Sequence, residues 1–545
     1  MTDAGPQGPS AAPPREDPGG GVGFTLPRSW PFLALFRGLL GGGLSFWRPV
    51  PAGVWHDDGV YMLIGKALAQ GEGLRYVGVP GDLPAVKFPP LYSSVLAVLW
   101  LVLGSVGAVT LSAELLNLVM VAAAGGLTAF ALHRGADLRR RDAVLLAGLA
   151  FVSADVWRPA LVPLSEPLFM ALVAGALAAW PRGARPGGLR EVAPLALLLA
   201  GAVLARSAGM ALVVGFAVAL LLRRGARAAA LAVAPAVVAA VAWGVWASSR
   251  APRIPEGLRD VLGPYGGWLS GQVLGAPGAF LRALPAHGEA VASRVMALLV
   301  PGLTGWGLWV VAVPLGVAAA VGAWRLSRTL APVTWTALAY GAMLLVWPFV
   351  DRRLVAPLHP LVVVLVGVGV LEGLKRLPTA RMRQALGVLA FAWVAAYASV
   401  TASRAARGWA VAGYQLRAGR LAAAVEVLHN TASPTAVVGA AEFWAALHLH
   451  GGWAAAPSAR FTPRAEDDAR PVWGTPREQL ELWWGVGVDH VLLEQGGQIH
   501  GEALNLLEQQ CPGTTTILAR MPPQVVVRLA WDETCARTLG LPERR

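Results

Sequence analysis

HDDGVY, residues 56–61, and KFPPLY, residues 87–92, are the stretches from which the fold can be worked out. The first follows the first long apolar segment, at the point where the chain should leave a lipid bilayer. Its carboxylates, Asp57 and Asp58, are costly to desolvate beside a membrane, so residues of this kind tend to mark function. Neighbouring carboxylates also raise each other's pKa, which suits a proton acceptor. The alternative is a solvated pair that only ends a helix.

The composition is typical of a membrane protein. The chain has 545 residues, of which 55% are hydrophobic and 14% charged, and its mean hydropathy is +0.54. Apolar runs of about 18 or more residues, the length that crosses a bilayer, recur along the chain. The net charge of +13 comes from basic residues in short connectors between these runs, as in cytoplasmic loops. The sequence therefore predicts a polytopic α-helical membrane protein, with no nucleic acid as partner.

The apolar runs predict about eleven transmembrane helices. We place them at residues 30–47, 109–132, 143–161, 166–181, 193–206, 208–222, 228–246, 303–324, 330–349, 354–374 and 385–402. The connectors expected on the cytoplasmic side are the basic ones, and they carry Arg134, Arg139, Arg140 and Arg141; Arg182, Arg185 and Arg190; Arg223, Arg224 and Arg227; Arg325 and Arg328; Lys375, Arg376, Arg381 and Arg383. The N-terminus is then inside and the C-terminus outside.

The same topology requires that residues 89–108 do not cross the membrane, although they are apolar enough. We predict that they form an interfacial or re-entrant helix on the outer side. The apolar residues of segment 60–70 have helical spacing, so we expect this segment to lie in the same interface.

Three parts follow from these patterns: a disordered cytoplasmic tail (1–27), a transmembrane domain (28–402) and an extracytoplasmic α/β domain (403–545). The transmembrane domain includes an interfacial segment, 51–108, and a long outer loop, 247–290, whose apolar side chains indicate a mobile cover. In the last part, short runs predict strands at 436–440, 489–494, 515–519 and 524–530, with helices at 441–449 and 502–510.

Polar and charged residues from distant parts of the chain meet on the outer side of this topology. They are Asp57, Asp58, Lys87, Asp155, Arg158, Ser165, Glu166, Arg206, Asp351, Arg352 and Arg353. A carboxylate can accept a proton from a hydroxyl group, and Arg and Lys can hold a phosphate and stabilise it as a leaving group. Lipid phosphates lie at this depth, so the set suits transfer of a sugar from a lipid phosphate. The alternative is that each cation is only an interfacial anchor.

Residues 30–400, roughly, resemble the polytopic glycosyltransferases with the GT-C fold. That group includes the dolichyl-phosphate-mannose–protein mannosyltransferases and the bacterial aminoarabinose transferase of lipid A. The resemblance rests on five motifs: Asp57-Asp58 followed by Tyr61; Lys87 followed by Pro89-Pro90-Leu91; Glu166-Pro167; Arg206 followed by Gly209; and Arg352-Arg353 with Pro357 and Pro360. Two positions depart from the pattern, because Asp58 stands where the family more often has Glu and Phe88 is inserted after Lys87.

The resemblance implies an enzyme of the inner (cytoplasmic) membrane. It implies transfer of a sugar from a polyprenyl-phosphate donor to a glycan, lipid or protein acceptor on the outer face, by single displacement with inversion. The residues that it implies are Asp57 as general base or acceptor-orienting carboxylate, with Asp58 and Glu166 to support it or position the acceptor. It also implies Lys87, Arg206 and Arg352 as donor-phosphate ligands, with Arg353 as the substitute for Arg352, and Tyr61 and Tyr92 in the donor and acceptor loops.

No cofactor is expected besides the donor substrate. Some relatives bind a divalent metal, but no metal-ligand spacing stands out in this chain, so no metal is predicted. His448, His450 and His490 are interpreted as ordinary surface or core residues rather than metal ligands. Cys511 and Cys535 pair if their segment lies in an oxidising space; otherwise they are two unrelated buried thiols.

Two other functions are compatible with a chain of this kind. A lipid or sugar transporter, or a flippase, places ionisable groups near the bilayer midplane and often has repeated halves. Here the charges lie at the rim and no clear repeat is present. A non-catalytic homologue that acts as an assembly partner would have the same fold, but it would not need Asp57, Lys87 and Glu166 together.

Overall fold

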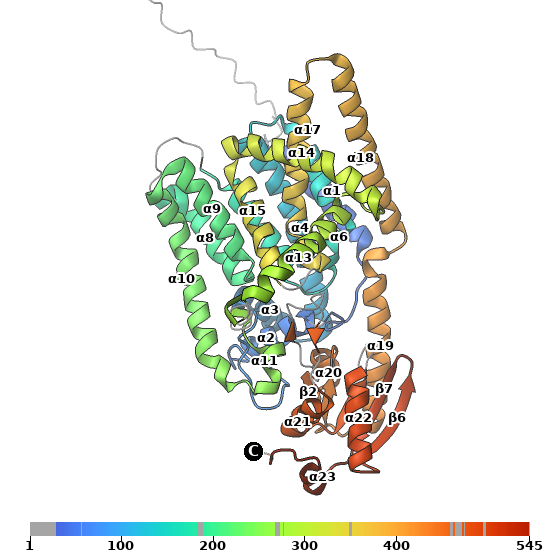
Figure 1. Ribbon diagram of the computed structural model, residues 1–545. Coiled ribbons are helices and arrows are strands. Elements are labelled where there is room, and N and C mark those ends of the chain that lie inside the picture. The colour runs from blue at the N-terminus through green and yellow to red at the C-terminus, as the bar shows by residue number, and fades with distance from the viewer. Residues whose placement is uncertain are drawn as a thin grey trace, which may run out of the picture.

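The computed structural model describes residues 29–55, 57–181, 189–266, 273–275, 277–347, 351–457, 462–463, 471–472, 475–493 and 498–543. Long helices form the upper part of the molecule in Figure 1, and a small sheet with short helices forms the lower part, which contains the C-terminus. The tail predicted to be disordered, residues 1–27, lies outside the described residues.

A helix is present at each of the predicted spans. These helices are α1 (Trp30–Phe46), α4 (Val106–Gly135), α5 (Arg140–Phe151), α7 (Glu166–Ala178), α8 (Leu189–Ala205), α9 (Gly209–Arg224), α10 (Ala226–Arg250), α14 (Trp306–Thr329), α15 (Ala331–Val346), α17 (His359–Arg376) and α18 (Ala380–Ala406). Among the described residues, four helical stretches are long and apolar enough to cross a membrane, or five if one bent pair is a single span. The predicted count of about eleven is therefore not established by helix length and composition.

The span predicted at 143–161 is helical but is not one continuous helix. The chain bends by 68° between α5 and the stretch Ala154–Leu161, which comprises α6 (Ala154–Trp157) and the 3₁₀ turn η1 (Arg158–Leu161). The side chain of Ser153 accepts a hydrogen bond from the backbone N–H of Asp155 and so caps a new helix at this point. The bend carries Asp155 and Arg158 away from the axis of α5.

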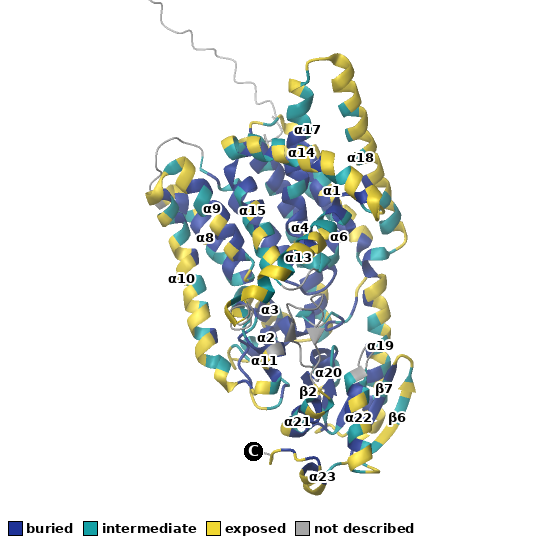
Figure 2. Ribbon diagram, viewed as in Figure 1, coloured by how far each residue is buried: buried dark blue, intermediate teal, exposed yellow. Residues whose placement is uncertain are grey.

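Lipid-facing surfaces can be recognised by their exposed aliphatic residues. Few residues of α10, α14 and α18 are buried, and much of α10 and α18 is yellow in Figure 2. The exposed side chains include Val238, Val241 and Val245 on α10, Val310 and Val313 on α14, and Val388 and Phe391 on α18. Apolar surface of this extent is unusual on a soluble protein and is expected where helices face lipid.

Glycines bring two of the helices into backbone contact. A Cβ atom on Gly322 of α14 would collide with the carbonyl of Leu365 in α17, and one on Gly369 would collide with the carbonyl of Ala318. Small residues of this kind allow membrane helices to approach closely.

The interfacial segment contains α2 (Asp57–Ala69) and α3 (Pro90–Leu103). Fourteen residues give α3 a length of about 21 Å, less than the thickness of a hydrocarbon core. This is compatible with the prediction that 89–108 does not cross. The expectation for 60–70 needs correction, because residues from Asp58 to Gly65 are all buried. Protein therefore covers α2 on every side along this stretch, and no face is left for lipid.

The predicted outer loop, 247–290, is partly helical. After α10 come the short elements η2 (Ala251–Arg253), η3 (Glu256–Leu258) and α11 (Arg259–Leu262), and then α13 (Pro277–Leu299). Pro285 lies inside α13, and the frequent prolines and glycines of this region concealed the helical spacing. In Figure 1, α13 runs obliquely across the helices behind it.

The C-terminal part is built on a five-stranded sheet with the order β2-β1-β5-β7-β6. Strands β2, β1 and β5 are parallel, and β7 and β6 complete the sheet in antiparallel fashion. The described elements are α19 (Trp409–Thr431), β1 (Val437–Ala440), α20 (Trp444–Gly451), β2 (Ala454–Pro457), β3 (Thr462–Pro463), β4 (Pro471–Val472), α21 (Pro476–Val486), β5 (His490–Leu493), α22 (Gln498–Gln510), β6 (Thr515–Met521), β7 (Gln524–Leu529) and α23 (Glu533–Thr538).

Four of these strands and two of these helices confirm the predictions for this part of the chain. The elements that were not predicted are β2, β3, β4, α19, α21 and α23. Cys511 and Cys535 form a disulfide, which settles the alternative left open above. The predicted boundary at residue 403 falls inside α18, and the limits of the domains remain a prediction.

Candidate active site

Four segments bring together two carboxylates and two guanidinium groups. We call Asp57, Glu166, Arg206 and Arg353 the carboxylate–arginine cluster. Arg353 Nη2 lies 2.6 Å from Asp57 Oδ2, and Arg353 Nε lies 3.2 Å from Glu166 Oε1. Arg206 Nη1 lies 2.6 Å from the same oxygen of Glu166. Arg353 therefore bridges the two carboxylates, and the cluster has no net formal charge.

Helix ends fix the position of these side chains. Asp57 and Glu166 lie in the first turns of α2 and α7, where the helix dipole stabilises negative charge. Arg353 belongs to the short helix α16 (Arg352–Val355), whose N-cap Asp351 accepts a hydrogen bond from the Arg353 backbone N–H at 3.1 Å. Arg206 occupies the tight turn between α8 and α9. This turn requires Gly209, because a Cβ atom there would collide with the backbone of Ala202.

Polar and aromatic side chains surround the cluster. The hydroxyl groups of Tyr61 and Ser165 share a hydrogen bond of 2.9 Å, and Arg206 also donates to the Ser165 hydroxyl at 3.1 Å. The Tyr61 ring packs edge-on against Tyr92, with 5.2 Å between the ring centres. Tyr61 is therefore linked to the cluster through the Ser165 hydroxyl, and Tyr92 packs against the Tyr61 ring.

Asn117 of α4 is a buried residue that the sequence analysis missed. Its side-chain amide donates to the carbonyls of Val162, at 2.9 Å, and Leu164, at 3.3 Å, and to the Tyr92 hydroxyl. It thereby holds the turn that leads into Ser165 and Glu166. The sequence feature that could have identified Asn117 is its position three residues after Glu114 in an apolar helix, since residues three apart lie on the same helix face.

Lys87 adjoins the site through aromatic contacts. Its ammonium group donates to the carbonyl of Val261 at 2.7 Å and lies 5.1 Å from the centre of the Tyr265 ring. The Phe88 ring contacts both this lysine and Tyr61, since its centre lies 5.8 Å from Lys87 Nζ and 4.7 Å from the Tyr61 ring centre. Val261 and Tyr265, both within the predicted outer loop 247–290, thus contact Lys87, and the role of this loop as a mobile cover stays a prediction.

Asp58 points toward the preceding loop. Its Oδ2 accepts a hydrogen bond from the backbone N–H of Gly53 at 2.8 Å, and its Oδ1 accepts one from Trp55 at 3.0 Å. Burial raises the pKa of this carboxyl group to about 6, and the amides partly oppose the shift because they favour the charged form. Within the described part of the chain Asp58 has no ion-pair partner, so its visible contribution is to shape the loop.

Arg352 is separate from the cluster and faces a second polar group. There Asp155 forms an ion pair of 2.8 Å with Arg404, and Arg352 and Arg158 both lie close enough to stabilise the Asp155 charge. The guanidinium of Arg158 lies 5.5 Å from the ring centres of Trp55, Trp409 and Tyr414. Of the two neighbouring arginines, the predicted substitute Arg353 is therefore the one that joins Asp57 and Glu166.

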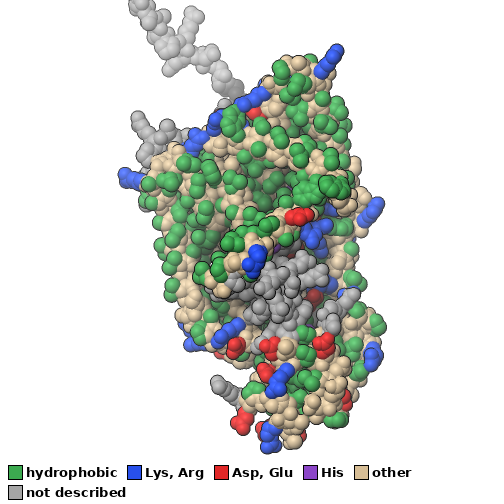
Figure 3. All heavy atoms as spheres, in the orientation of Figure 1, with side chains coloured by type: hydrophobic (Ala, Val, Ile, Leu, Met, Phe, Trp, Pro, Cys, Tyr) green, Lys and Arg blue, Asp and Glu red, His purple; other side chains and the backbone are tan. Residues whose placement is uncertain are grey.

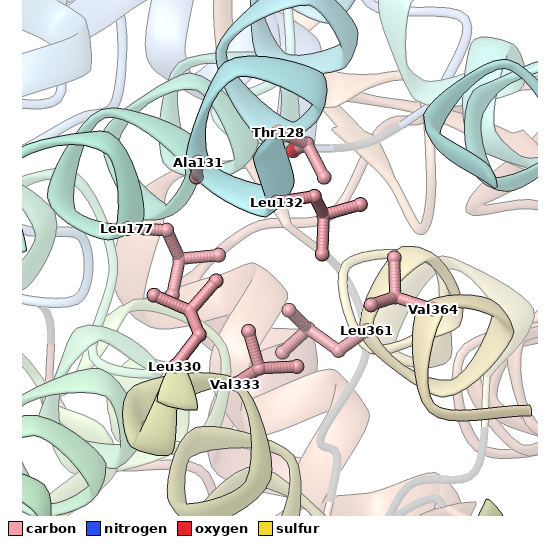
Figure 4. A pocket seen from close by; sticks show the side chains of 8 residues that line it. All are labelled: Thr128, Ala131, Leu132, Leu177, Leu330, Val333, Leu361 and Val364. Carbon is pink, nitrogen blue, oxygen red and sulfur yellow. The ribbon is translucent and has the colours of Figure 1, made fainter. Parts of the chain in front are cut away.

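A cavity inside the helical part is too small to be a substrate site. Its volume is about 10 Å³, roughly the space of one water molecule. Figure 4 shows that its lining is almost wholly apolar: Thr128, Ala131, Leu132, Leu177, Leu330, Val333, Leu361 and Val364. It is a packing void between α4, α7, α15 and α17.

Each of the three histidines considered above has a hydrogen-bond contact, and that of His450 reaches the loop before α2. His448 Nδ1 lies 2.9 Å from the carbonyl of Trp453, His450 Nε2 lies 2.9 Å from the carbonyl of Ala52, and His490 Nδ1 lies 2.8 Å from Asp489. In the described ranges no three His, Cys, Asp or Glu residues are grouped as they would be around a metal ion.

The space-filling view separates the apolar and charged surfaces. Figure 3 shows mostly hydrophobic side chains along the flank of α8 to α10, with basic residues at its upper end. Acidic and basic residues gather at its lower end and around the C-terminal part. This distribution is the one expected of a chain that crosses a membrane with charged groups at both rims.

No protein-family model matches the sequence, and no curated protein matches it either. Solved structures do resemble the fold. ArnT from Cupriavidus metallidurans in the apo state has a TM-score of 0.52 at 16% identity, covering 94% of this chain and 98% of the other. ArnT bound to undecaprenyl phosphate has a TM-score of 0.51, also at 16% identity, covering 91% and 97%. The archaeal oligosaccharyltransferase AglB from Archaeoglobus fulgidus has a TM-score of 0.48 at 12% identity, covering 85% and 69%.

Identities this low establish a common fold and nothing about the reaction. The structural likeness to ArnT extends over nearly the whole of both chains. The chain therefore has the GT-C fold that its motifs resembled.

Proposed function

We propose that this chain is a membrane glycosyltransferase that moves a sugar from a polyprenyl-phosphate donor to an acceptor on the outer face of the cytoplasmic membrane. The single observation that carries the proposal is the carboxylate–arginine cluster, in which Arg353 joins Asp57 to Glu166. One buried and one partly buried carboxylate held by two guanidinium groups are costly to assemble and suit a site that handles charge.

In the proposed reaction Asp57 is the general base. Its carboxylate takes the proton from the acceptor hydroxyl while the hydroxyl oxygen forms a bond to the anomeric carbon of the donor sugar. The bond from that carbon to the phosphate oxygen breaks, and the polyprenyl phosphate leaves with the electron pair. Attack opposite the leaving group inverts the configuration. Arg353 would keep Asp57 ionised until it receives the proton, since a nearby cation favours the charged form.

Lys87 and Arg206 are the proposed ligands of the donor phosphate, with Arg352 or Arg353 as the third. Lys87 now donates to a backbone carbonyl, that of Val261, and a phosphate oxygen is a stronger acceptor for an ammonium group. One ArnT structure contains undecaprenyl phosphate, which supports a lipid phosphate as the ligand. Tyr61 and Tyr92 would border the donor and acceptor, and Glu166 would keep both arginines in place.

The proposed topology has about eleven spans, a cytoplasmic N-terminus and an extracytoplasmic C-terminal domain. The basic connectors support it, and so does the disulfide between Cys511 and Cys535, because disulfides persist in oxidising compartments. The proposed parts are those predicted above, with residues 254–266 as a cover over Lys87. No metal is required in this proposal, because guanidinium groups already neutralise the cluster carboxylates that could bind one.

The decisive experiment uses Asp57→Asn in proteoliposomes that contain undecaprenyl-phosphate-linked sugars. The asparagine has nearly the shape of the aspartate and cannot accept the proton. We expect transfer to fall at least about 100-fold, within the range that general base catalysis contributes. Transfer at the wild-type rate would show that Asp57 is not the base. Consumption of none of the donors by the wild-type protein would instead favour a transporter or a non-catalytic assembly partner.

A further inference from the structure

The loop that precedes α2 lies next to Asp57 in the chain and is bonded to Asp58. Residues 52–55, which we call the pre-α2 loop, are held from one side by Asp58, whose carboxylate accepts the N–H groups of Gly53 and Trp55. Asp57 is the first residue of α2 and pairs with Arg353. The residue that holds the loop and the residue that pairs with Arg353 are therefore neighbours at the start of α2.

Helix α20 of the C-terminal part covers the other side of this loop at backbone distance. A Cβ atom on Gly53 would collide with Ala446, and one on Gly59 would lie 2.9 Å from the Cβ of Ala445. Gly53 also has a φ of +87°, which L side chains rarely adopt. Two segments almost four hundred residues apart thus meet through glycines on one side and alanines on the other.

Polar contacts from the C-terminal part bind two carbonyls of the loop. His450 Nε2 lies 2.9 Å from the Ala52 carbonyl, and since a carbonyl can only accept, Nε2 carries the proton. Arg417 of α19 donates to the Val54 carbonyl and forms an ion pair of 2.6 Å with Glu442. The pre-α2 loop is therefore fixed between Asp58 and the C-terminal part.

We propose that α20 positions the general base. In this inference Ala446 and His450 are positioning residues that hold the pre-α2 loop so that Asp57 faces the acceptor hydroxyl. The C-terminal part is then needed for turnover and not only for stability or donor binding. The inference rests on the proposed function, because it assigns a role to residues outside the cluster in that reaction. A displacement of about 1 Å in a reacting group can cost 100-fold in rate.

The test compares full-length variants reconstituted in lipid nanodiscs. His450→Ala removes the contact to Ala52, His450→Gln restores a donor at a similar position, and Ala446→Leu pushes against Gly53. The control is Leu507→Ala, a fully buried residue of α22 in a separate apolar core. Turnover and KM are measured with a panel of undecaprenyl-phosphate-linked hexoses and pentoses, and hydrogen–deuterium exchange is measured on peptides that cover residues 50–60.

We expect kcat to fall about 10-fold in His450→Ala and about 100-fold in Ala446→Leu, with KM for the donor within about twofold of wild type. His450→Gln should recover most of the loss. Exchange in residues 50–60 should become faster in His450→Ala and not in His450→Gln. Leu507→Ala should unfold at a lower temperature and keep the wild-type kcat while it is folded.

Two results would overturn the inference: unchanged exchange and kcat in His450→Ala, or an equal loss of kcat in Leu507→Ala. The first would show that the contact does not hold the loop, and the second would show that only general stability matters. If the wild-type protein consumes none of the donors, the proposed function fails. The exchange measurement then still tests whether His450 holds the pre-α2 loop. Faster exchange in His450→Ala supports this role, and unchanged exchange refutes it.

Discussion

Arg352 and Arg353 are adjacent in α16, yet the structure gives them different partners, and this difference can be measured. Arg353 touches both Asp57 and Glu166, whereas Arg352 forms no ion pair with any residue that the structure describes. We therefore expect Arg353→Ala to destabilise the protein much more than Arg352→Ala does. The pair is a matched control, since both changes remove the same side chain from the same short helix.

The magnitude follows from the burial of the partners. Removing one partner of a buried ion pair typically costs about 3–5 kcal/mol. The Arg353 side chain is 20% exposed and Glu166 is fully buried, and Glu166 keeps its pairing with Arg206. We therefore expect about 3 kcal/mol for Arg353→Ala, at the lower end of that range. For the partly exposed Arg352 we expect less than about 1 kcal/mol. Arg353→Lys should lie between them, because one ammonium group cannot reproduce both contacts.

The assay is unfolding of the purified protein in mixed micelles with increasing SDS, followed by tryptophan fluorescence. Circular dichroism checks that each variant begins with the wild-type helix content. Equal loss of stability in the two alanine variants would refute the assignment of Arg353 to the cluster. A stable Arg353→Ala protein that retains full turnover would also show that the ion pair with Asp57 has no role in the reaction.

Four further outcomes are expected. Lys87→Met should raise the KM for the lipid-linked donor at least about 10-fold with a smaller change in kcat, as measured by initial rates, because it removes a charge-assisted phosphate contact. The pKa of Asp58 is raised from 3.8 to about 6 in the folded protein, so its contribution to stability is present below pH 3.8 and is lost as the pH rises through about 6. Asp58→Asn should remove this dependence from unfolding curves recorded between pH 4 and 7. Mass mapping without reductant should recover a peptide that links Cys511 to Cys535, and free thiols at both positions would contradict the structure. EDTA should leave turnover unchanged, whereas loss of turnover that Mg²⁺ or Mn²⁺ restores would require a metal site.

Much of the fold could be predicted because apolar periodicity and basic connectors report directly on helices and topology. The helices of the membrane part and four strands of the C-terminal sheet were found in this way. The bend before Asp155 and the helix α13 were not, because a local cap at Ser153 and a proline inside a helix change the structure without changing the hydropathy. Whether a helix of 14 residues such as α3 crosses or turns back depends on its neighbours rather than on its own sequence.

The residues of the candidate site were predicted as a group, but their ion pairs were not predicted. Asp57, Glu166 and Arg206 do meet, since each lies at the end of a helix on the same side. The choice between Arg352 and Arg353 depends on the rotation of a four-residue helix, which is too short for a periodic signal. The Asp58 carboxylate is turned toward two backbone amides, and contacts to backbone amides cannot be predicted from residue types.

The glycine contact between α14 and α17 limits where a long-chain lipid can enter. Gly322 and Gly369 place each helix against carbonyl groups of the other, so the two backbones pack as closely as small residues allow. Separating the two helices would lose this close packing along their contact. In the proposed reaction this seam should therefore stay shut, and a lateral gateway for the tail of a lipid-linked donor would belong at another boundary of the bundle.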